Sequence, residues 1–345
     1  MSILLNSMLG LAEKSRLPDK LIRYGIRYLC KKRLKESVRG RNNVDQFVDA
    51  MKNSPIAPVP EKANEQHYEL PARFFDLCLG PNRKYSGCIW ENNVETLREA
   101  EEKSLEQVCR RADLKDGQSI LELGCGWGSL TLWMARKYPN SQITAVSNSR
   151  FQREAIETLA SAYGLSNVRI ITADMNDLEL NEKFDRAVSI EMFEHMRNWQ
   201  RLLQSVSHWL KSDGRLFVHV FANRSQPYEF QTEGPSNWMG KYFFSGGIMP
   251  SHDLMSKFDE HMTVEEDWIV NGNNYAKTAE AWLSNLDQTR NQAMDILTDN
   301  YGAKDAELWF QRWRIFFMAC AELFAFENGQ QWHISHYRLR PVVGS

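Results

Sequence analysis

The sequence of 345 residues lacks a strong net charge, a long uncharged apolar run and any paired-cysteine motif. A formal net charge of -2 gives the chain no general attraction for nucleic acid or anionic membranes, so such a partner would need a local basic patch. No run is long enough to cross a bilayer without charges, and we expect a cytoplasmic protein. The six cysteines form no CxxC pair and no His/Cys spacing suited to zinc, so we expect free thiols and no metal site.

One local basic patch does exist near the N-terminus. Basic residues dominate between Lys14 and Arg41, where they alternate with leucine, isoleucine and tyrosine, as in a basic amphipathic helix. Such a helix can contact a membrane surface or an anionic substrate. It can equally pack on the protein core and leave its basic face in water, and this second interpretation is the one we adopt.

The most informative stretch is Ile120–Gly128, an apolar strand that ends in three alternating glycines. Glycine tolerates a positive φ and has no Cβ, so Gly124, Gly126 and Gly128 allow a tight strand-to-helix turn that a nucleotide can approach closely. A helix should begin near Ser129, where its free amide groups would favour a carboxylate or phosphate on the ligand. The stretch therefore predicts a cofactor-binding turn.

The spacing of these glycines also narrows the choice of cofactor. It reads GxGxG, with Ser129 where the dinucleotide motif GxGxxG has its third glycine. The strand expected at residues 143–147 runs into Ser147, Asn148 and Ser149, none of which is the carboxylate that usually holds the ribose of NAD. Both features favour S-adenosylmethionine over NAD, and a turn that binds no ligand is the third interpretation.

Apolar strands alternate with helical stretches between residues 63 and 222, which we take as the core domain. This alternation predicts a Rossmann-like α/β fold with a doubly wound parallel sheet. The strands are expected over residues 119–123, 142–146, 168–172, 186–190 and 215–220.

The rest of the chain is expected to add to this core at both ends. Residues 1–62 should be helical and end in a proline-rich linker at 54–60. Residues 223–327 should form a helical cap over the site, and residues 328–345 should return to the core, with the apolar run 332–339 as an edge strand. The cap helices are expected near residues 278–297 and 304–326.

A dense group of titratable side chains follows the fourth expected strand. Glu191, Glu194 and His195 lie within five residues, and the carboxyl ends of parallel strands are where open sheets bind ligands. Methyl transfer to an amine needs orientation and removal of a proton, which a Glu or His base can provide without a metal. A helix cap or an ion pair is the structural alternative for these side chains. By themselves, His219 and Tyr275 indicate packing rather than catalysis.

With these residues in view, the chain resembles the cyclopropane-fatty-acyl-phospholipid synthase superfamily of S-adenosylmethionine-dependent enzymes. It is most similar to the coclaurine N-methyltransferase branch, over about residues 63–340. The segments that carry the resemblance are Lys84–Trp90, Leu121–Gly128, Thr144–Ser149 with Gln152, Glu191–Met196, Phe244–Ser251 and Tyr275–Trp282.

The resemblance implies a class I methyltransferase fold and a set of residues for S-adenosylmethionine. Asn148 and Gln152 would hold its ribose, and Asp174 and Met175 its adenine region. The whole expected cofactor site comprises Tyr85, Ser86, Leu123, Gly124, Gly126, Gly128, Ser147, Asn148, Gln152, Asp174 and Met175.

The two branches of the superfamily imply different chemistry. Glu191, Glu194 and His195 match the acid–base cluster of the N-methyltransferases. Lipid-cyclopropanating members hold a bicarbonate with a Cys, a Glu, a His and a Tyr. Glu194, His219 and Tyr275 match three of these positions, but Gly87 stands where the cysteine would be.

We therefore predict a monomeric or homodimeric methyltransferase that acts on the nitrogen of a small, aromatic amine. Glu194 and His195 would be base and substrate orienter, Glu191 would hold the ammonium, and His219 and Tyr275 complete the candidate catalytic set. One alternative is a cyclopropane-fatty-acyl-phospholipid synthase that the N-terminal basic helix recruits to the membrane. Another is a cofactor-binding pseudoenzyme that serves as an interaction module.

Overall fold

The computed structural model describes residues 2–39, 44–60, 70–91 and 93–342. The expected domain boundary at residues 62 and 63 and the end of the basic run at Arg41 lie outside these residues.

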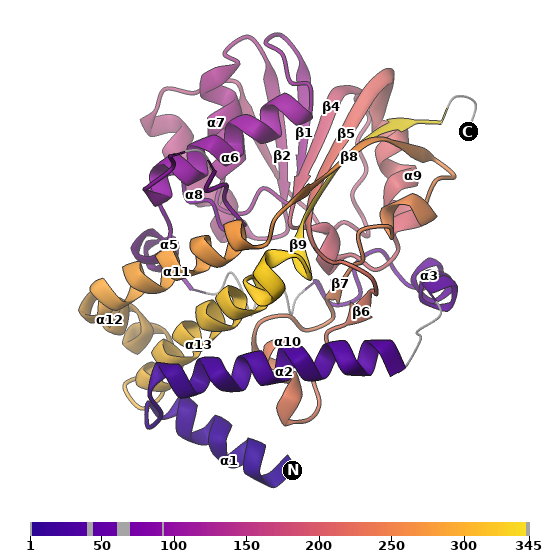
Figure 1. The fold of residues 1–345 in the computed structure, drawn as a ribbon. Coiled ribbons are helices and arrows are strands. Elements are labelled where there is room, and N and C mark those ends of the chain that lie inside the picture. Colours follow the sequence, from indigo (N-terminus) through magenta and orange to yellow (C-terminus); the bar gives the residue numbers. More distant parts are fainter. Residues whose placement is uncertain (1, 40–43, 61–69, 92, 343–345) are drawn as a thin grey trace.

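A seven-stranded sheet forms the centre of the molecule, with strand order β3-β2-β1-β4-β5-β9-β8 (Figure 1). Neighbours among β3, β2, β1, β4 and β5 are all parallel, whereas β9 is antiparallel to both β5 and β8. The five parallel strands are those expected from the sequence. The strands are β1 Ser119–Leu123, β2 Gln142–Ser147, β3 Val168–Thr172, β4 Phe184–Ile190, β5 Leu210–Asn223, β8 Met262–Val270 and β9 Trp332–Pro341, and a separate short pair joins β6 Tyr228–Glu229 to β7 Ile248–Met249.

Helices cover both faces of this sheet, as a doubly wound fold requires. Successive side chains of a strand point to opposite faces, so Ile120 of β1 packs with the apolar residues of α6 and α7, whereas Leu121 and Leu123 pack with those of α9. The helices around the sheet are α3 Val44–Lys52, α5 Ala72–Cys78, α6 Leu97–Arg111, α7 Ser129–Lys137, α8 Arg150–Ala162 and α9 Trp199–Trp209.

The expectation that residues 332–339 form an edge strand is wrong. This run belongs to β9, which lies between β5 and β8, and β8 is the edge. The sequence pattern did not predict β8, because three consecutive acidic residues, 265–267, occupy its centre and interrupt its apolar pattern. Charges on an exposed edge strand discourage pairing with another chain, which explains their presence there.

The cap consists of helices α11 Asn273–Gln288, α12 Arg290–Tyr301 and α13 Ala306–Phe324, together with the short α10 Trp238–Tyr242. The N-terminal helices α1 Ser2–Glu13 and α2 Asp19–Arg39 lie beside α13 (Figure 1). Arg27 of α2 pairs with Glu322 of α13 at 2.7 Å, and Asp19 pairs with Arg314 at 2.7 Å. The expectation that the basic helix packs on the protein is thus confirmed. Within the described residues, no helix is long and apolar enough to span a membrane.

The proline-rich segment at residues 54–60 is attached to the core. The Ala57 amide donates to the side-chain oxygen of Asn176 at 3.0 Å, and the Asn176 amide donates back to the Ala57 carbonyl at 2.9 Å. The Arg197 amide donates to the carbonyl of Ile56 at 2.7 Å. These bonds hold the segment at the carboxyl edge of the sheet, where Ala57, Val59 and Pro60 line a cavity.

Candidate active site

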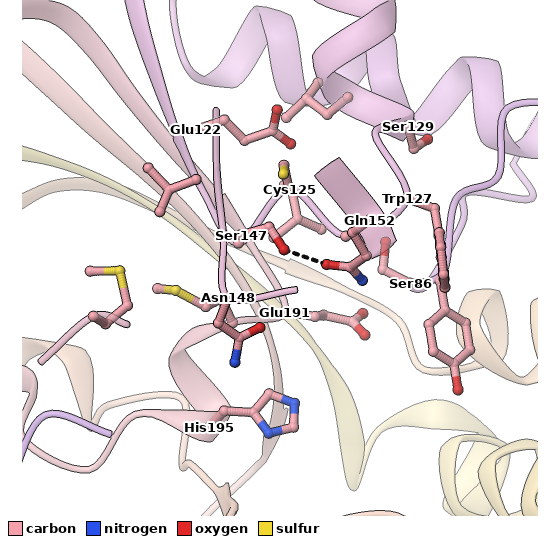
Figure 2. Close-up of a pocket in the computed structure, with 18 of the residues that line it drawn as sticks. Ser86, Glu122, Cys125, Trp127, Ser129, Ser147, Asn148, Gln152, Glu191 and His195 are labelled. Atoms are coloured by element: carbon pink, nitrogen blue, oxygen red, sulfur yellow. Dashed lines mark hydrogen bonds between the residues drawn. The ribbon is translucent and has the colours of Figure 1, made fainter. Parts of the chain in front are cut away.

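A cavity lies at the carboxyl ends of the parallel strands, around the glycine turn after β1 (Figure 2). Most of the side chains that the sequence reading assigned to the cofactor line it: Tyr85, Ser86, Gly124, Gly126, Ser147, Asn148, Gln152, Asp174 and Met175. Two expected residues lie elsewhere. Leu123 is buried in the core, and Gly128 caps the start of α7, where an added Cβ would meet Ile156 Cγ1 at 2.6 Å.

The turn after β1 requires glycine for two reasons. Gly124 and Gly126 have φ values of +78° and +52°, in the left-handed region that favours glycine. A Cβ added at Gly126 would have no atom within 4 Å, whereas one at Gly124 would meet Met192 Cβ at 2.7 Å. The backbone at Gly126 is therefore open to the cavity, as a close-binding ligand needs.

The end of β2 presents polar side chains to the same cavity. The hydroxyl of Ser147 donates to Oε1 of Gln152 at 2.6 Å, which fixes the orientation of that amide (Figure 2). Gln152 is 2% exposed, and its Nε2 has no hydrogen-bond partner among the described residues. A buried donor without a partner is costly, and a ligand oxygen in the cavity would satisfy it.

Glu122 and Lys84 line this cavity although the sequence reading did not assign them to it. Glu122 accepts a hydrogen bond of 2.6 Å from Thr131 Oγ1, and burial raises its pKa to about 8. The signal for Glu122 was a single acidic residue in an otherwise apolar strand just before the glycine turn. Lys84 is buried, and its ammonium donates to Ser86 Oγ at 2.6 Å and to the Gly87 carbonyl at 2.7 Å.

A second, largely aromatic cavity lies between the core and the cap. Three residues, Tyr85, Glu191 and His195, line both cavities, so the two meet at these side chains. The remaining lining residues of the second cavity are Phe221, Phe230, Met239, Phe244, Met249, Tyr275, Trp282, Phe316, Cys320, Leu323 and Phe324.

Glu191 lies at the end of β4, and three polar groups contact its carboxylate. Oε1 accepts from the Gly87 amide at 3.0 Å and faces His219 Nε2 at 3.1 Å, and Oε2 accepts from the Tyr275 hydroxyl at 2.8 Å. Its backbone has a φ of +48°, a strained value for a residue with a side chain. Burial raises the pKa of Glu191, and the nearby Lys84 ammonium opposes that rise.

His195 ends the short 3-10 turn Phe193–His195 that follows β4. Its ring stacks on Phe244 with centroids 4.5 Å apart, and Figure 2 shows it projecting toward the same part of the cavity as Glu191. Burial lowers the pKa of His195 to about 4, and the Glu191 carboxylate only partly opposes this shift. The imidazole is therefore neutral near pH 7, and the Glu191 carboxylate is the neighbour that would stabilise it on accepting a proton.

Glu194 has a different setting from its two neighbours in the cluster. It is fully buried, and its Oε1 accepts a hydrogen bond of 2.7 Å from the amide of Phe221 on β5. It is not among the residues that line either cavity, and within the described chain its Oε2 has no hydrogen-bond partner. Burial, and secondarily the Glu191 charge, raise the pKa of Glu194 well above its ordinary value, because both disfavour the charged carboxylate.

Cysteines line both cavities, with Cys125 in the first and Cys320 in the second. All six cysteines are buried free thiols, as expected from the sequence. In the part of the chain that the structure describes, no group of three or more His, Cys, Asp or Glu residues could hold a metal ion.

Comparisons with known proteins agree with this geometry. Residues 59–334 match the family model described as mycolic acid cyclopropane synthetase. The (S)-coclaurine N-methyltransferase of Thalictrum flavum subsp. glaucum is 35% identical over 311 residues, which cover 89% of this chain and 85% of that protein. The cyclopropane-fatty-acyl-phospholipid synthase of Escherichia coli (strain K12) is 30% identical over 273 residues, covering 78% and 66%. A crystal structure of coclaurine N-methyltransferase bound to N-methylheliamine and SAH matches with a TM-score of 0.94 at 31% identity, over 98% of this chain and 99% of that one.

Proposed function

The chain belongs to the mycolic acid cyclopropane synthetase family, and from that premise we propose that it transfers the methyl group of S-adenosylmethionine to the nitrogen of a small, aromatic amine. One observation carries the proposal. Tyr85, Glu191 and His195 line both the cavity around the glycine turn and the aromatic cavity under the cap, so a methyl donor in the first and an acceptor in the second would meet there.

The first cavity suits S-adenosylmethionine in the groups that it offers. The open backbone at Gly126 leaves room for the methionine part of the cofactor. Gln152 Nε2 would donate to a ribose hydroxyl, and the Glu122 carboxyl would accept from the amino group of the methionine part. Asp174 and Met175 remain the proposed adenine contacts. Further support is that the similar solved enzyme was crystallised with SAH.

The second cavity suits a cationic aromatic acceptor. Its aromatic walls, among them Phe244, Tyr275 and Trp282, can stack on a ring and attract a cation through their faces. The Glu191 carboxylate at its inner end would attract the ammonium and place it where the two cavities meet.

The proposed mechanism assigns proton removal to His195. An ammonium has no lone pair, and neutral His195 would take its proton and so free the nitrogen to attack. The new N–C bond then forms as the S–C bond breaks in line, and the sulfonium becomes a neutral thioether. Glu191 would hold the acceptor as an ammonium before proton removal, and the product again as an ammonium once the methyl group has been transferred. Glu194 lies outside both cavities, so we propose that it positions the turn and β5 through its bond to Phe221, rather than serving as the base that the sequence reading suggested.

The lipid-cyclopropanating alternative is less compatible with the site. The Gly87 amide, His219 and Tyr275 occupy positions that the family resemblance links to a bicarbonate, and here all three bind the Glu191 carboxylate. A Cβ at position 87, as a cysteine would have, would meet Ile334 Cδ1 at 2.5 Å and Tyr275 Cδ1 at 2.9 Å. The protein's own carboxylate thus takes the place of the anion.

The test is to incubate the purified protein with methyl-labelled S-adenosylmethionine and either a panel of arylalkylamines or unsaturated phospholipid vesicles. Label should appear on the nitrogen of an amine. Label on lipid would overturn the proposal in favour of the synthase, and tight cofactor binding without any transfer would favour the interaction module.

Variants test the assigned roles in the same assay. Glu191→Gln and His195→Asn should each lower turnover by about 10²–10⁴-fold, the range for loss of acid–base assistance, while cofactor affinity is retained. Glu194→Gln keeps an acceptor for the Phe221 amide, so it should lower turnover by less than about tenfold. If Glu194→Gln abolishes turnover and His195→Asn does not, Glu194 is the base.

A further inference from the structure

A continuous chain of hydrogen bonds leads from a cation at the end of α6 to the site. Arg111 Nη1 lies 2.6 Å from His336 Nδ1, His336 Nε2 lies 3.0 Å from His219 Nδ1, and His219 Nε2 lies 3.1 Å from Glu191 Oε1. Neither Arg111 nor His336 lines the cavities around Glu191.

The sheet itself brings the two histidines together. His219 of β5 and His336 of β9 are direct partners in the antiparallel register, and each is 1% exposed. The ring of Phe217 packs edge-on against His336, with centroids 5.0 Å apart. Arg111 is held from the other side by the ring of Trp268 on β8, 4.8 Å from its guanidinium carbon. Four elements therefore fix the geometry of this chain.

Because arginine can only donate, it fixes which group donates and which accepts in each hydrogen bond of this series. A guanidinium has only donors, so His336 Nδ1 must accept and its proton must lie on Nε2. His336 Nε2–H then donates to His219 Nδ1, which places the proton of His219 on Nε2, facing Glu191. Other tautomers would set two donors or two acceptors against each other.

Burial and the neighbouring cations both disfavour a charged form of His219 and of His336. Burial, followed by neighbouring cations, lowers the pKa of His219 and of His336 well below the ordinary value. Lys84 and Arg111 act on both rings, and His219 adds to the effect on His336. A neutral ring can donate through only one nitrogen, so the tautomer decides what His219 does toward Glu191.

We propose that Arg111 and His336 are positioning residues that lock His219 as a hydrogen-bond donor to Glu191. The lock favours the ionised form of the carboxylate and holds it in one orientation, with His219, the Gly87 amide and Tyr275 as its three donors. The catalytic consequence rests on the proposed function, because it needs Glu191 to receive an ammonium. The tautomers themselves do not depend on it.

The direct test is nitrogen NMR of the full chain with labelled histidine, without any ligand. The eight histidines are few enough to assign by single substitutions, and the two ring-nitrogen shifts report which nitrogen is protonated. In the wild type, His219 and His336 should both carry the proton on Nε2. Without the lock, the reversed tautomers become possible in molecules whose Glu191 is protonated and donates to His219 Nε2. Arg111→Met should therefore leave both rings as tautomer mixtures, and His336→Phe should do so for His219. A proton on Nδ1 of His219 in the wild type, or unchanged His219 shifts in both variants, would overturn the proposal.

The pH dependence of kcat/KM gives an independent readout. The titratable and charged groups around Glu191 are His219, Tyr275, His195, Lys84, Glu194, Cys88 and Cys320. Without the lock, His219 could accept from a protonated Glu191. His336→Phe should therefore move the acidic limb upward by about one pH unit and lower kcat/KM about tenfold below it.

Two further variants separate this role from simple packing. His336→Gln offers an oxygen to Arg111 and an N–H to His219, so it should restore the wild-type limb. His333→Phe removes another buried histidine of β9 outside the chain of bonds, and it should leave the limb and the His219 shifts unchanged. The positioning role is contradicted if His336→Phe does not move the acidic limb of the kcat/KM profile, or if His336→Gln does not restore it. Absence of methyl transfer by the wild type would instead refute the proposed function, with the NMR result still standing.

Discussion

The hydroxyl of Tyr275 on α11 donates a hydrogen bond of 2.8 Å to Oε2 of Glu191 at the end of β4. This bond joins a helix of the cap to the carboxyl end of strand β4, at the point where the two cavities meet. The Tyr275 ring also stacks on Phe324 of α13, with centroids 4.2 Å apart and planes 8° from parallel. The cap and the carboxylate are therefore positioned by the same side chain.

Tyr275→Phe should lower kcat/KM by roughly 10- to 100-fold, because a hydrogen bond to a charged group contributes about 1.5–3 kcal/mol. Phenylalanine keeps the stacking on Phe324, so the fold should be unaffected. The measurement is steady-state methyl transfer to the amine identified in the panel. Tyr301→Phe, a stacked tyrosine of α12 outside both cavities, is the matched control and should behave as the wild type. Equal activity of both variants would show that the bond to Glu191 is unimportant.

Gly87→Cys should destabilise the protein by about 1–3 kcal/mol, the usual cost of overpacking a core, and should not create lipid cyclopropanation. The added Cβ would press on Ile334 and on the Tyr275 ring, at 2.5 Å and 2.9 Å. Urea unfolding and the labelled-vesicle assay measure the two effects. Gly25→Ala in α2 is the control, since a Cβ there meets nothing within 4 Å and should be neutral or slightly stabilising. Gain of label on lipid by Gly87→Cys would contradict the prediction.

Glu122→Gln should change how stability depends on pH. Burial raises the pKa of Glu122 to about 8 from an ordinary 4.5, so between these values the folded state binds more protons than the unfolded state. Wild-type stability should therefore fall relative to the variant as pH rises from 4.5 to 8, by up to about 1.4 kcal/mol per pH unit. Urea unfolding at pH 5, 6, 7 and 8 measures this, and a difference between the two proteins that stays constant across the series would refute it.

Gln152→Ala should weaken binding of S-adenosylmethionine by about tenfold, the effect of losing a hydrogen bond worth about 1–1.5 kcal/mol. The buried Nε2 of Gln152 is the group that would contact the cofactor. Calorimetry with the cofactor and with its demethylated product gives the affinities. Arg153→Ala removes the next side chain of α8, which pairs with Glu157 at the surface, and should leave affinity unchanged. If both variants bind S-adenosylmethionine as tightly as the wild type, Gln152 does not contact the cofactor.

Much of the fold follows from local patterns in the chain. The strands at residues 119–123 and 168–172 and the start of α7 at Ser129 appear in the structure as expected, because alternating burial and a glycine turn are encoded within a few residues. β8 was missed because its three central acidic residues conceal a strand whose existence depends on pairing with β9.

By itself, the sequence determined that a glycine turn and an acidic cluster follow neighbouring parallel strands, and the carboxyl ends of such strands must meet at one edge of the sheet. Only the tertiary structure decided which side chains face one another there. Glu194 is turned toward the backbone of β5, while Glu191 receives donors from Gly87, His219 and Tyr275. These groups come from three distant parts of the chain. The parallel register of β5 against β4, in which His219 is the partner of Ile190, and the packing of the cap bring them within hydrogen-bond distance of Glu191. No local periodicity encodes that register, because it depends on contacts between residues far apart in the chain.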